Sequence, residues 1–261
     1  MKTRTLRLCL IAALSCVTAA AMAQNPFAGT WKVDYSQSHV TGDTIGFAQE
    51  AGGMVHFTTP TESYSFKPDG TDTKNSFGDA VQWKQMDEHN LKEITKEGKE
   101  GSMVVTDTWT LSSDGKTLQD AVSGTRPSGQ EINVTETYTR VGTGQGLFGK
   151  WKSTKYENNS PTTAKIDANG DNGIIWNIPE IKASVTLNFD GKDVAPTGPT
   201  VPQGLTLAAT KVGPKSFELT EKENGKVIFH ARYTVSADGK TMTEVGSTPG
   251  AAPVKVVYQK S

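Results

Sequence analysis

Apolar side chains alternate with polar ones along much of the chain. The alternation is clearest in two runs: Trp31, Val33, Tyr35, and Val227, Phe229, Ala231, Tyr233, Val235. Successive side chains of a strand point to opposite faces, so this pattern indicates strands with one buried face. No run shows convincing helical spacing. The pattern therefore predicts an all-β protein made of short strands.

Pairs of Asp or Asn with Gly separate these runs. Such pairs supply the positive φ angles of tight hairpin turns, so they predict that consecutive strands pair antiparallel. They stand at Asp69-Gly70, Asp114-Gly115, Asn169-Gly170, Asp190-Gly191, Asn224-Gly225 and Asp238-Gly239. The segment Asp167–Ile174 resembles the start of a calcium loop, but it lacks the glycine and the glutamate that such a loop needs. We interpret it as a hairpin turn and expect no metal site.

One module is repeated within the chain. Phe27–Lys32 returns as Leu147–Lys152, and Ser113–Leu118 returns as Ala237–Met242. A repeat of this kind defines structural units before any fold is assigned. The Gly-rich run 142–146 separates the copies, and we place the boundary there, between modules 24–143 and 147–261.

A meander leaves two unpaired edges unless its sheet closes or folds over itself, and closure is the common solution. We therefore expect two tandem antiparallel meander modules, each a small barrel or half-barrel of about eight strands. A sandwich is the alternative.

The start of each module, Gly29-Thr30-Trp31 and Gly149-Lys150-Trp151, resembles the Gly-x-Trp signature of lipocalins. A longer set of motifs is similar to uncharacterised exported lipocalin-like β-barrel proteins of soil bacteria: Pro26–Lys32, Phe189–Asp193, Asp238–Met242 and Tyr258–Lys260. The resemblance implies a lipocalin-like barrel in each module, with a cation of the last strand covering the tryptophan. Those pairs would be Arg140 over Trp31 and Lys260 near Trp151. The family has no established activity, so the resemblance implies none.

Residues 1–23 have the pattern of a secretory signal peptide: a basic start, an apolar stretch too short to span a membrane, and the ending Ala21-Met22-Ala23. Both cysteines, Cys9 and Cys16, lie in this segment. Leu14-Ser15-Cys16 is an imperfect lipoprotein cleavage box, and lipidation is the alternative to simple cleavage. We expect a periplasmic or secreted protein after cleavage near Ala23, without disulfides.

The charge of the remaining chain argues against several partners. The signal segment holds three of the 27 basic residues and none of the 28 acidic ones, which leaves a net charge of about −4 with both signs interspersed. Such a balance gives no cluster of basic residues that would indicate binding to nucleic acid or anionic lipid. No later segment resembles a transmembrane helix. We expect a monomer that binds neither nucleic acid nor membranes.

The inward faces of the two modules differ in polarity. Alternation through Val105 and Trp109 places Asp107 inward, where the second module has Ala231. The same reasoning places Glu136 inward against Val256, and Glu62 and Tyr64 opposite Val185 and Leu187. Buried carboxylates are costly, so the pattern predicts a polar pocket in module 1. Its ligand-binding residues would be Glu62, Tyr64, Trp83, Asp107, Trp109, Glu136 and Arg140. The alternatives are a bulge that shifts the phase or a solvated barrel mouth.

These features favour a small-molecule-binding protein, with a non-catalytic structural or protein-interaction module of the cell envelope as the alternative. A third reading is an acid–base enzyme that uses Glu62, Asp107 and Glu136. The histidines His39, His56, His89 and His230 lack metal-ligand spacing, and no nucleophile motif or phosphate loop occurs. We interpret the mixed-sign run Lys92–Glu100 as a solvated hairpin. We expect no enzyme activity, no cofactor and no metal.

The signal peptide generates the first prediction. Export from a bacterial host should yield a chain that begins at Gln24 and carries no lipid, because the cleavage pattern ends at Ala23. Intact-mass measurement of the exported protein checks both points. A diacylated Cys16 at the new N-terminus would contradict the prediction.

Overall fold

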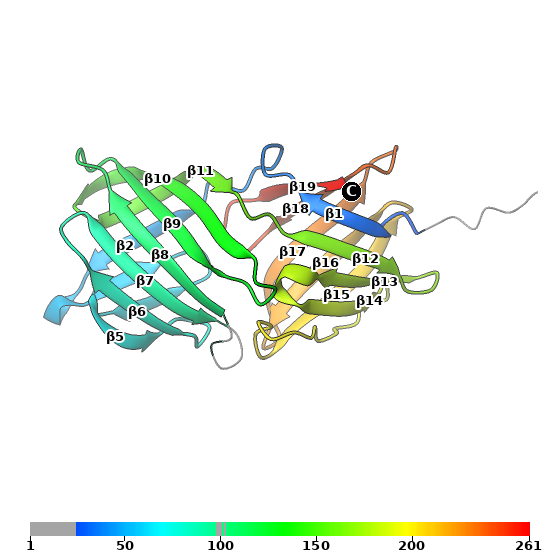
Figure 1. Cartoon of the computed structure of the whole chain (residues 1–261), viewed down its shortest axis with the longest axis horizontal. Helices are drawn as coiled ribbons and strands as arrows, with labels where there is room; N and C mark the ends of the chain where they lie inside the picture. The colour runs from blue at the N-terminus through cyan, green and yellow to red at the C-terminus, as the bar shows by residue number, and fades with distance from the viewer. Residues whose placement is uncertain (1–24, 98–100, 102) are drawn as a thin grey trace, which may run out of the picture.

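The computed structural model describes residues 25–97, 101 and 103–261. The predicted signal peptide, 1–23, lies outside the described residues. Those that are described form an all-β fold of two antiparallel sheets with ten and nine strands, side by side in Figure 1. Their helical segments include the short 3-10 turns η1 (Ala51–Gly53) and η3 (Pro179–Ile181). Within these residues, no helix has the length and apolar character to cross a membrane.

The ten-stranded sheet, here called barrel 1, has the order β4-β3-β2-β11-β10-β9-β8-β7-β6-β5. Its strands are β2 (Thr44–Gln49), β3 (Val55–Thr58), β4 (Ser63–Phe66), β5 (Asp69–Lys74), β6 (Ala80–Gln85), β7 (Asn90–Glu97), β8 (Met103–Leu111), β9 (Thr117–Thr125), β10 (Glu131–Gln145) and β11 (Phe148–Asn158).

The nine-stranded sheet, here called barrel 2, has the order β14-β13-β12-β1-β19-β18-β17-β16-β15. Its strands are β1 (Gly29–Val33), β12 (Thr163–Ala168), β13 (Gly173–Ile178), β14 (Ala183–Asn188), β15 (Leu205–Gly213), β16 (Ser216–Glu223), β17 (Lys226–Val235), β18 (Thr241–Ser247) and β19 (Val254–Lys260).

Each sheet curls until its edge strands approach one another. In barrel 1 the edges β4 and β5 follow each other in the chain, and the backbone N–H of Ser63 donates to Ser76 Oγ at 2.9 Å. In barrel 2 the segment before β15 bridges both edges, through Ser184 with Thr197 and Val194 with Leu207. The predicted all-β fold of two antiparallel barrel-like units is therefore confirmed.

The hairpins between β8 and β9 and between β17 and β18 are built alike. Gly115 and Gly239 have φ angles of 68° and 72°, which a side chain would disfavour. The carboxylates of Asp114 and Asp238 each accept a hydrogen bond from the backbone N–H two residues later, at 3.1 Å. The segment around Asn169 is likewise the hairpin turn between β12 and β13. These three predicted turns are confirmed. Asp69-Gly70 and Asp190-Gly191 instead lie where β4 leads to β5 and β14 leads to β15, and in neither case are the two strands neighbours in a sheet.

The first strands of the two modules are exchanged between the barrels. β1 pairs with β12 and β19 of barrel 2, whereas β11 pairs with β10 and β2 of barrel 1. The reason is the hairpin between β10 and β11, whose loop is only Gly146-Leu147, with Gln145 opposite Phe148. So short a loop keeps β11 beside β10, and β1 completes the other barrel. The predicted modules 24–143 and 147–261 therefore do not coincide with the barrels.

The exchange also changes which cation covers which tryptophan. The Arg140 guanidinium lies 4.0 Å from the ring centre of Trp151, and the Lys260 ammonium lies 4.9 Å from that of Trp31. Such cation–π contacts stabilise by about 0.5–1 kcal/mol at exposed sites and more when desolvated. The expected pairs, Arg140 over Trp31 and Lys260 near Trp151, were wrong. In each barrel the cation and the tryptophan lie on neighbouring strands: Arg140 on β10 beside Trp151 on β11, and Lys260 on β19 beside Trp31 on β1.

The glycines of the Gly-x-Trp signature make room for these cations. A Cβ atom on Gly149 would lie 2.9 Å from a guanidinium nitrogen of Arg140, and one on Gly29 would overlap Cε of Lys260. Their φ angles, 134° and 141°, also disfavour any side chain. The signature thus encodes a capped tryptophan at one end of each barrel.

The exchange generates the second prediction. A fragment of residues 43–160 should fold alone, because it contains every described strand of barrel 1 together with Trp151. A fragment of residues 159–261 lacks β1 and Trp31 and should stay unfolded until a peptide of residues 25–38 is added. Dispersion of amide resonances measures both. A well-dispersed spectrum of 159–261 without the peptide would contradict the arrangement.

Candidate functional site

A cavity of ≈ 1290 Å³ extends from the interior of barrel 1 to the facing surface of barrel 2. Its walls come from β2, β3 and β7–β10, and from the turns at residues 59–62 and 75–79. Barrel 2 contributes residues 200–203 with Leu205, Glu223, Asn224 and Ile228. The mouth of the cavity therefore lies between the barrels, on the side where they adjoin in Figure 1.

Carboxylates face one another across neighbouring strands of this wall. Glu93 on β7 is directly opposite Asp107 on β8, and Asp120 on β9 is directly opposite Glu136 on β10. Opposed residues of antiparallel strands have Cβ atoms about 4.5–5.5 Å apart, and like charges there are destabilising. We call these residues the carboxylate band. Glu62, in the turn before β4, adds a further acid to the cavity wall.

Asp120 is the most buried member of the band. The residue is 6% exposed, and its Oδ1 atom has no hydrogen-bond partner among the described residues. Burial first, and then the charges of Asp107 and Glu93, raise the pKa of the Asp120 carboxyl well above its usual range. This carboxyl therefore holds a proton at a pH at which a solvated aspartate has lost it.

The other acids of the band are perturbed in the same direction. Burial, followed by the charges of Asp107 and Glu62, raises the pKa of Glu93 well above its usual range. Burial also raises the pKa of Glu136, although the Ser153 hydroxyl donates a hydrogen bond to this carboxylate. A group that carries positive charge would relieve these carboxylates when they ionise.

Aromatic rings form the other part of the wall. Phe57, Trp109 and Tyr138 line the cavity, with ring centres 6.2 Å apart for Phe57 and Trp109 and 5.9 Å apart for Trp109 and Tyr138. These rings offer an apolar contact next to the acids. The cavity is thus lined by acids and aromatic rings together.

A second layer supports Glu93 from behind. The Trp83 indole N–H donates to the Tyr64 hydroxyl at 3.2 Å, and that hydroxyl donates to Glu93 Oε1 at 3.4 Å. The Thr95 hydroxyl donates to the same oxygen at 3.2 Å. Trp83 and Tyr64 therefore position a carboxylate that lines the cavity.

The structure brings most of the predicted site residues together. Glu62, Asp107 and Trp109 line the cavity. Tyr64 and Trp83 lie in the layer behind it, and Glu136 lies opposite Asp120 on the neighbouring strand.

Arg140 is elsewhere. Its guanidinium donates to the backbone carbonyls of Gly115, Phe148 and Gly146, at 2.7, 2.8 and 2.5 Å, at the end of the barrel sealed by Trp151. Those contacts give Arg140 a structural role in closing this end.

Sequence reasoning missed Glu93 and Asp120. The run that contains Glu93 was interpreted as a solvated hairpin because its charges are mixed, but Leu91 and Thr95 on either side of Glu93 are buried. Asp120 lies two residues after the buried Leu118 on β9 and is buried as well. The alternation could have found both residues if it had been given more weight than the charge.

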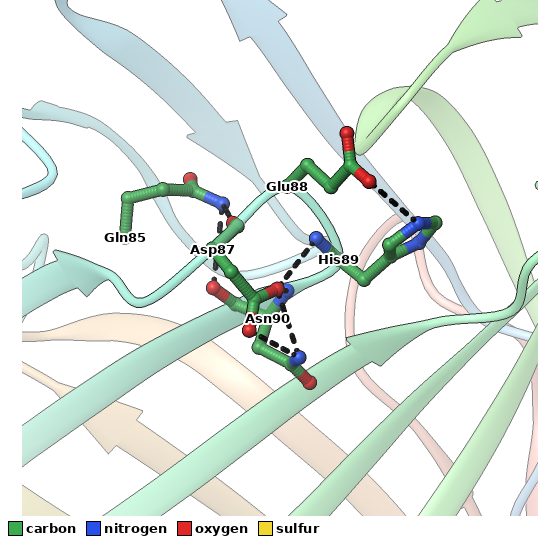
Figure 2. Close-up of polar contacts among 5 residues, drawn as sticks. All are labelled: Gln85, Asp87, Glu88, His89 and Asn90. Atoms are coloured by element: carbon green, nitrogen blue, oxygen red, sulfur yellow. Dashed lines mark hydrogen bonds and ion pairs between the residues drawn. The ribbon is translucent and has the colours of Figure 1, made fainter.

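At the sealed end, polar side chains hold the turn between β6 and β7 (Figure 2). The Asp87 carboxylate accepts hydrogen bonds from the backbone N–H groups of His89 and Asn90, at 2.8 and 2.9 Å. The side-chain hydrogen bond from Asn90 lowers the pKa of Asp87. The Gln85 amide donates to the backbone carbonyls of Asp87 and Asn90, and His89 lies 3.5 Å from Glu88. These contacts account for the polar residues here as turn structure.

One serine–histidine pair lies on the outside of barrel 1. Ser63 Oγ is 3.2 Å from His56 Nε2, but the Ser65 hydroxyl occupies Nδ1 at 2.9 Å and Glu50 is 3.8 Å from that nitrogen. The backbone N–H of Ser63 already donates to Ser76 and is not free to stabilise an oxyanion. The pair therefore lacks the parts of a nucleophilic site.

Comparison with known proteins gives no relative from which a role could be carried over. No protein-family model matches the chain, and no curated protein matches it. The resemblance to lipocalin-like proteins of soil bacteria therefore stays a prediction.

The raised pKa of Asp120 generates the third prediction. The folded protein keeps this proton after the unfolded chain, with its ordinary pKa of 3.8, has lost it. The native state therefore loses stability as the pH rises above that value. Asp120→Asn removes the effect, so its gain in stability should be larger at pH 8 than at pH 4.5 by about 1 kcal/mol or more.

Urea unfolding at the two pH values measures this difference. The exposed Glu131→Gln serves as the control, and its effect on stability should be the same at both pH values. The comparison with wild type is needed because Glu221 of barrel 2, whose pKa burial raises to about 7, contributes in the same direction. An Asp120→Asn effect of equal size at both pH values would contradict the assignment.

Proposed function

We propose that this protein is exported and binds a small molecule in the cavity of barrel 1. The observation that carries the proposal is a difference between the barrels at equivalent strand positions. Barrel 1 has the opposed pair Glu93 and Asp107, where barrel 2 has Leu219 and Ala231. Both residues of barrel 2 belong to its hydrophobic core. Apolar side chains can therefore fill this position of the fold, as they do in barrel 2, whereas barrel 1 has carboxylates there.

Burying carboxylates in a barrel reduces stability unless something in the interior compensates them. Residues that lower stability and line a cavity are typical of binding sites, where function opposes stability. Pockets for small ligands usually measure about 300–1000 Å³. The cavity, which includes the space next to barrel 2, measures ≈ 1290 Å³ and has room for such a ligand.

Export is supported by residues 1–23, whose basic start, apolar stretch and small-residue ending match a signal peptide. The absence of cysteine from residue 24 onward fits a barrel whose stability comes from packing. A binding protein in the periplasm or outside the cell would meet its ligand in solution.

Filling the cavity generates the fourth prediction. Val122 lines the cavity, and its neighbour Ala121 is exposed. Val122→Trp should reduce binding of the uncharged fluorescent probe N-phenyl-1-naphthylamine at least fivefold, because the indole occupies the interior. Ala121→Trp adds the same group on the outer face and should leave the affinity unchanged.

Titration of the probe with the full-length chain and each variant measures the effect. Amide spectra establish that both variants are folded. Equal affinity of the two variants would refute a binding cavity in barrel 1.

A further inference from the structure

Asp120 lacks a hydrogen-bond donor that barrel 2 provides for its counterpart. The equivalent residue in barrel 2 is Glu244, which is 7% exposed and accepts a hydrogen bond from the Tyr258 hydroxyl at 2.6 Å. Tyr138 takes the place of Tyr258 in barrel 1, but the aspartate is one methylene shorter than the glutamate. Oδ1 of Asp120 is left without a partner in the described part of the chain. Asp120 lines the cavity, so a ligand bound there can donate a hydrogen bond to this carboxyl group.

The surroundings of Asp120 specify the charge of that donor. Glu62, Glu93 and Asp107 line the same cavity, with Asp79 and Glu223 also on its wall. Among the described residues that line it, none is Lys, Arg or His. A negatively charged ligand would face several carboxylates at short range, whereas a cation would be attracted to all of them.

A bare metal ion does not fit this arrangement. In the described ranges, no group of three or more His, Cys, Asp or Glu side chains has the geometry to hold a metal ion. The wall is instead shared between acids and the rings of Phe57, Trp109 and Tyr138. The faces of aromatic rings attract cations within about 6 Å, and the flat apolar surface accepts the body of an organic ligand.

We propose that the small molecule of the preceding section is an organic cation, a protonated amine joined to an apolar body. The inference rests on the proposed binding function of barrel 1. The ammonium group donates to Asp120 and is surrounded by Glu93 and Asp107. The apolar body lies on Trp109 and Phe57 and extends towards the mouth at barrel 2.

Binding of such a ligand is coupled to loss of protons from the carboxylate band. An amine stays protonated up to about pH 10, so between pH 5 and pH 8 only the protein groups titrate. The cation favours the ionised carboxylates, and the affinity therefore rises with pH in this range. The titratable groups that face the band or adjoin it are Asp43 before β2, Glu62 and Tyr64, Glu93 on β7, Asp107 on β8, Asp120 on β9, Glu136 and Tyr138 on β10, and Tyr156 on β11.

Matched probes that differ in charge test the proposal. Octylamine, octanol and octanoate share one chain and carry a positive, no and a negative charge. Calorimetric titration of the full-length protein at pH 8 should give an affinity for octylamine at least tenfold above that for octanol, and the lowest affinity for octanoate. The octylamine affinity should fall at pH 5, and the octanol affinity should change less than twofold.

Substitutions connect the preference to Asp120. Asp120→Asn keeps the shape of the side chain and should weaken octylamine binding about tenfold or more while leaving octanol within twofold. Glu244→Gln at the equivalent position of barrel 2 is the matched control and should leave octylamine binding unchanged. Glu93→Gln serves as the second variant if the Asp120 variant does not fold.

The outcomes separate this proposal from the binding function itself. The neutral naphthylamine probe could bind in barrel 1 while octanol or octanoate binds as tightly as octylamine. In that case the cavity binds ligands, but the proposal that its ligand is a cation is refuted. Loss of octylamine binding in Glu244→Gln but not in Asp120→Asn would also refute it. If neither the naphthylamine probe nor any octyl compound binds, both proposals fail.

Discussion

The short hairpin between β10 and β11 is the constraint on which both barrels depend. Its loop, Gly146-Leu147, keeps β11 beside β10, so that Trp151 seals barrel 1 beneath Arg140. β1 then completes barrel 2, and residues 34–43 connect one barrel with the other. Contacts along this connection hold the barrels together: His39 bridges to Lys255, and the Asp43 carboxylate accepts a hydrogen bond from the backbone N–H of Ala252 at 2.6 Å.

The same strand geometry produces two different interiors. Side chains of a strand alternate between the two faces of its sheet. Every side chain at an inward position must therefore fit the interior of the barrel. Barrel 2 fills the position of the Glu93–Asp107 pair with Leu219 and Ala231 and satisfies its buried Glu244 through Tyr258. Barrel 1 keeps acids there and remains hollow. The same inward positions of this fold therefore accept either carboxylates, as in barrel 1, or apolar side chains, as in barrel 2.

Comparison of the two copies identified several of the acids that face the interior of barrel 1. Asp107 and Glu62 line the cavity, and Glu136 lies opposite Asp120, because the two-residue period persists along a regular strand. Glu93 was assigned to solvent because charge usually marks an exposed position, and this rule fails where a barrel encloses polar groups. Arg140 was assigned to the pocket as a cation that could compensate the inward carboxylates, yet it lies at the sealed end.

The sequence by itself determined most of the local structure: alternation defined the strands, most of the pairs of Asp or Asn with Gly marked hairpins, and the repeat defined two units of one fold. Those features depend on residues that are close in sequence, so short segments are enough to predict them. Only the tertiary structure decided which sheet each first strand joins. β1 and β11 carry the same Gly-x-Trp signature and suit either barrel, so the choice depends on the length of one loop and on pairing between residues far apart in the chain. Tertiary structure also decided the site, because the acids on separate strands meet only when those strands pair in this register.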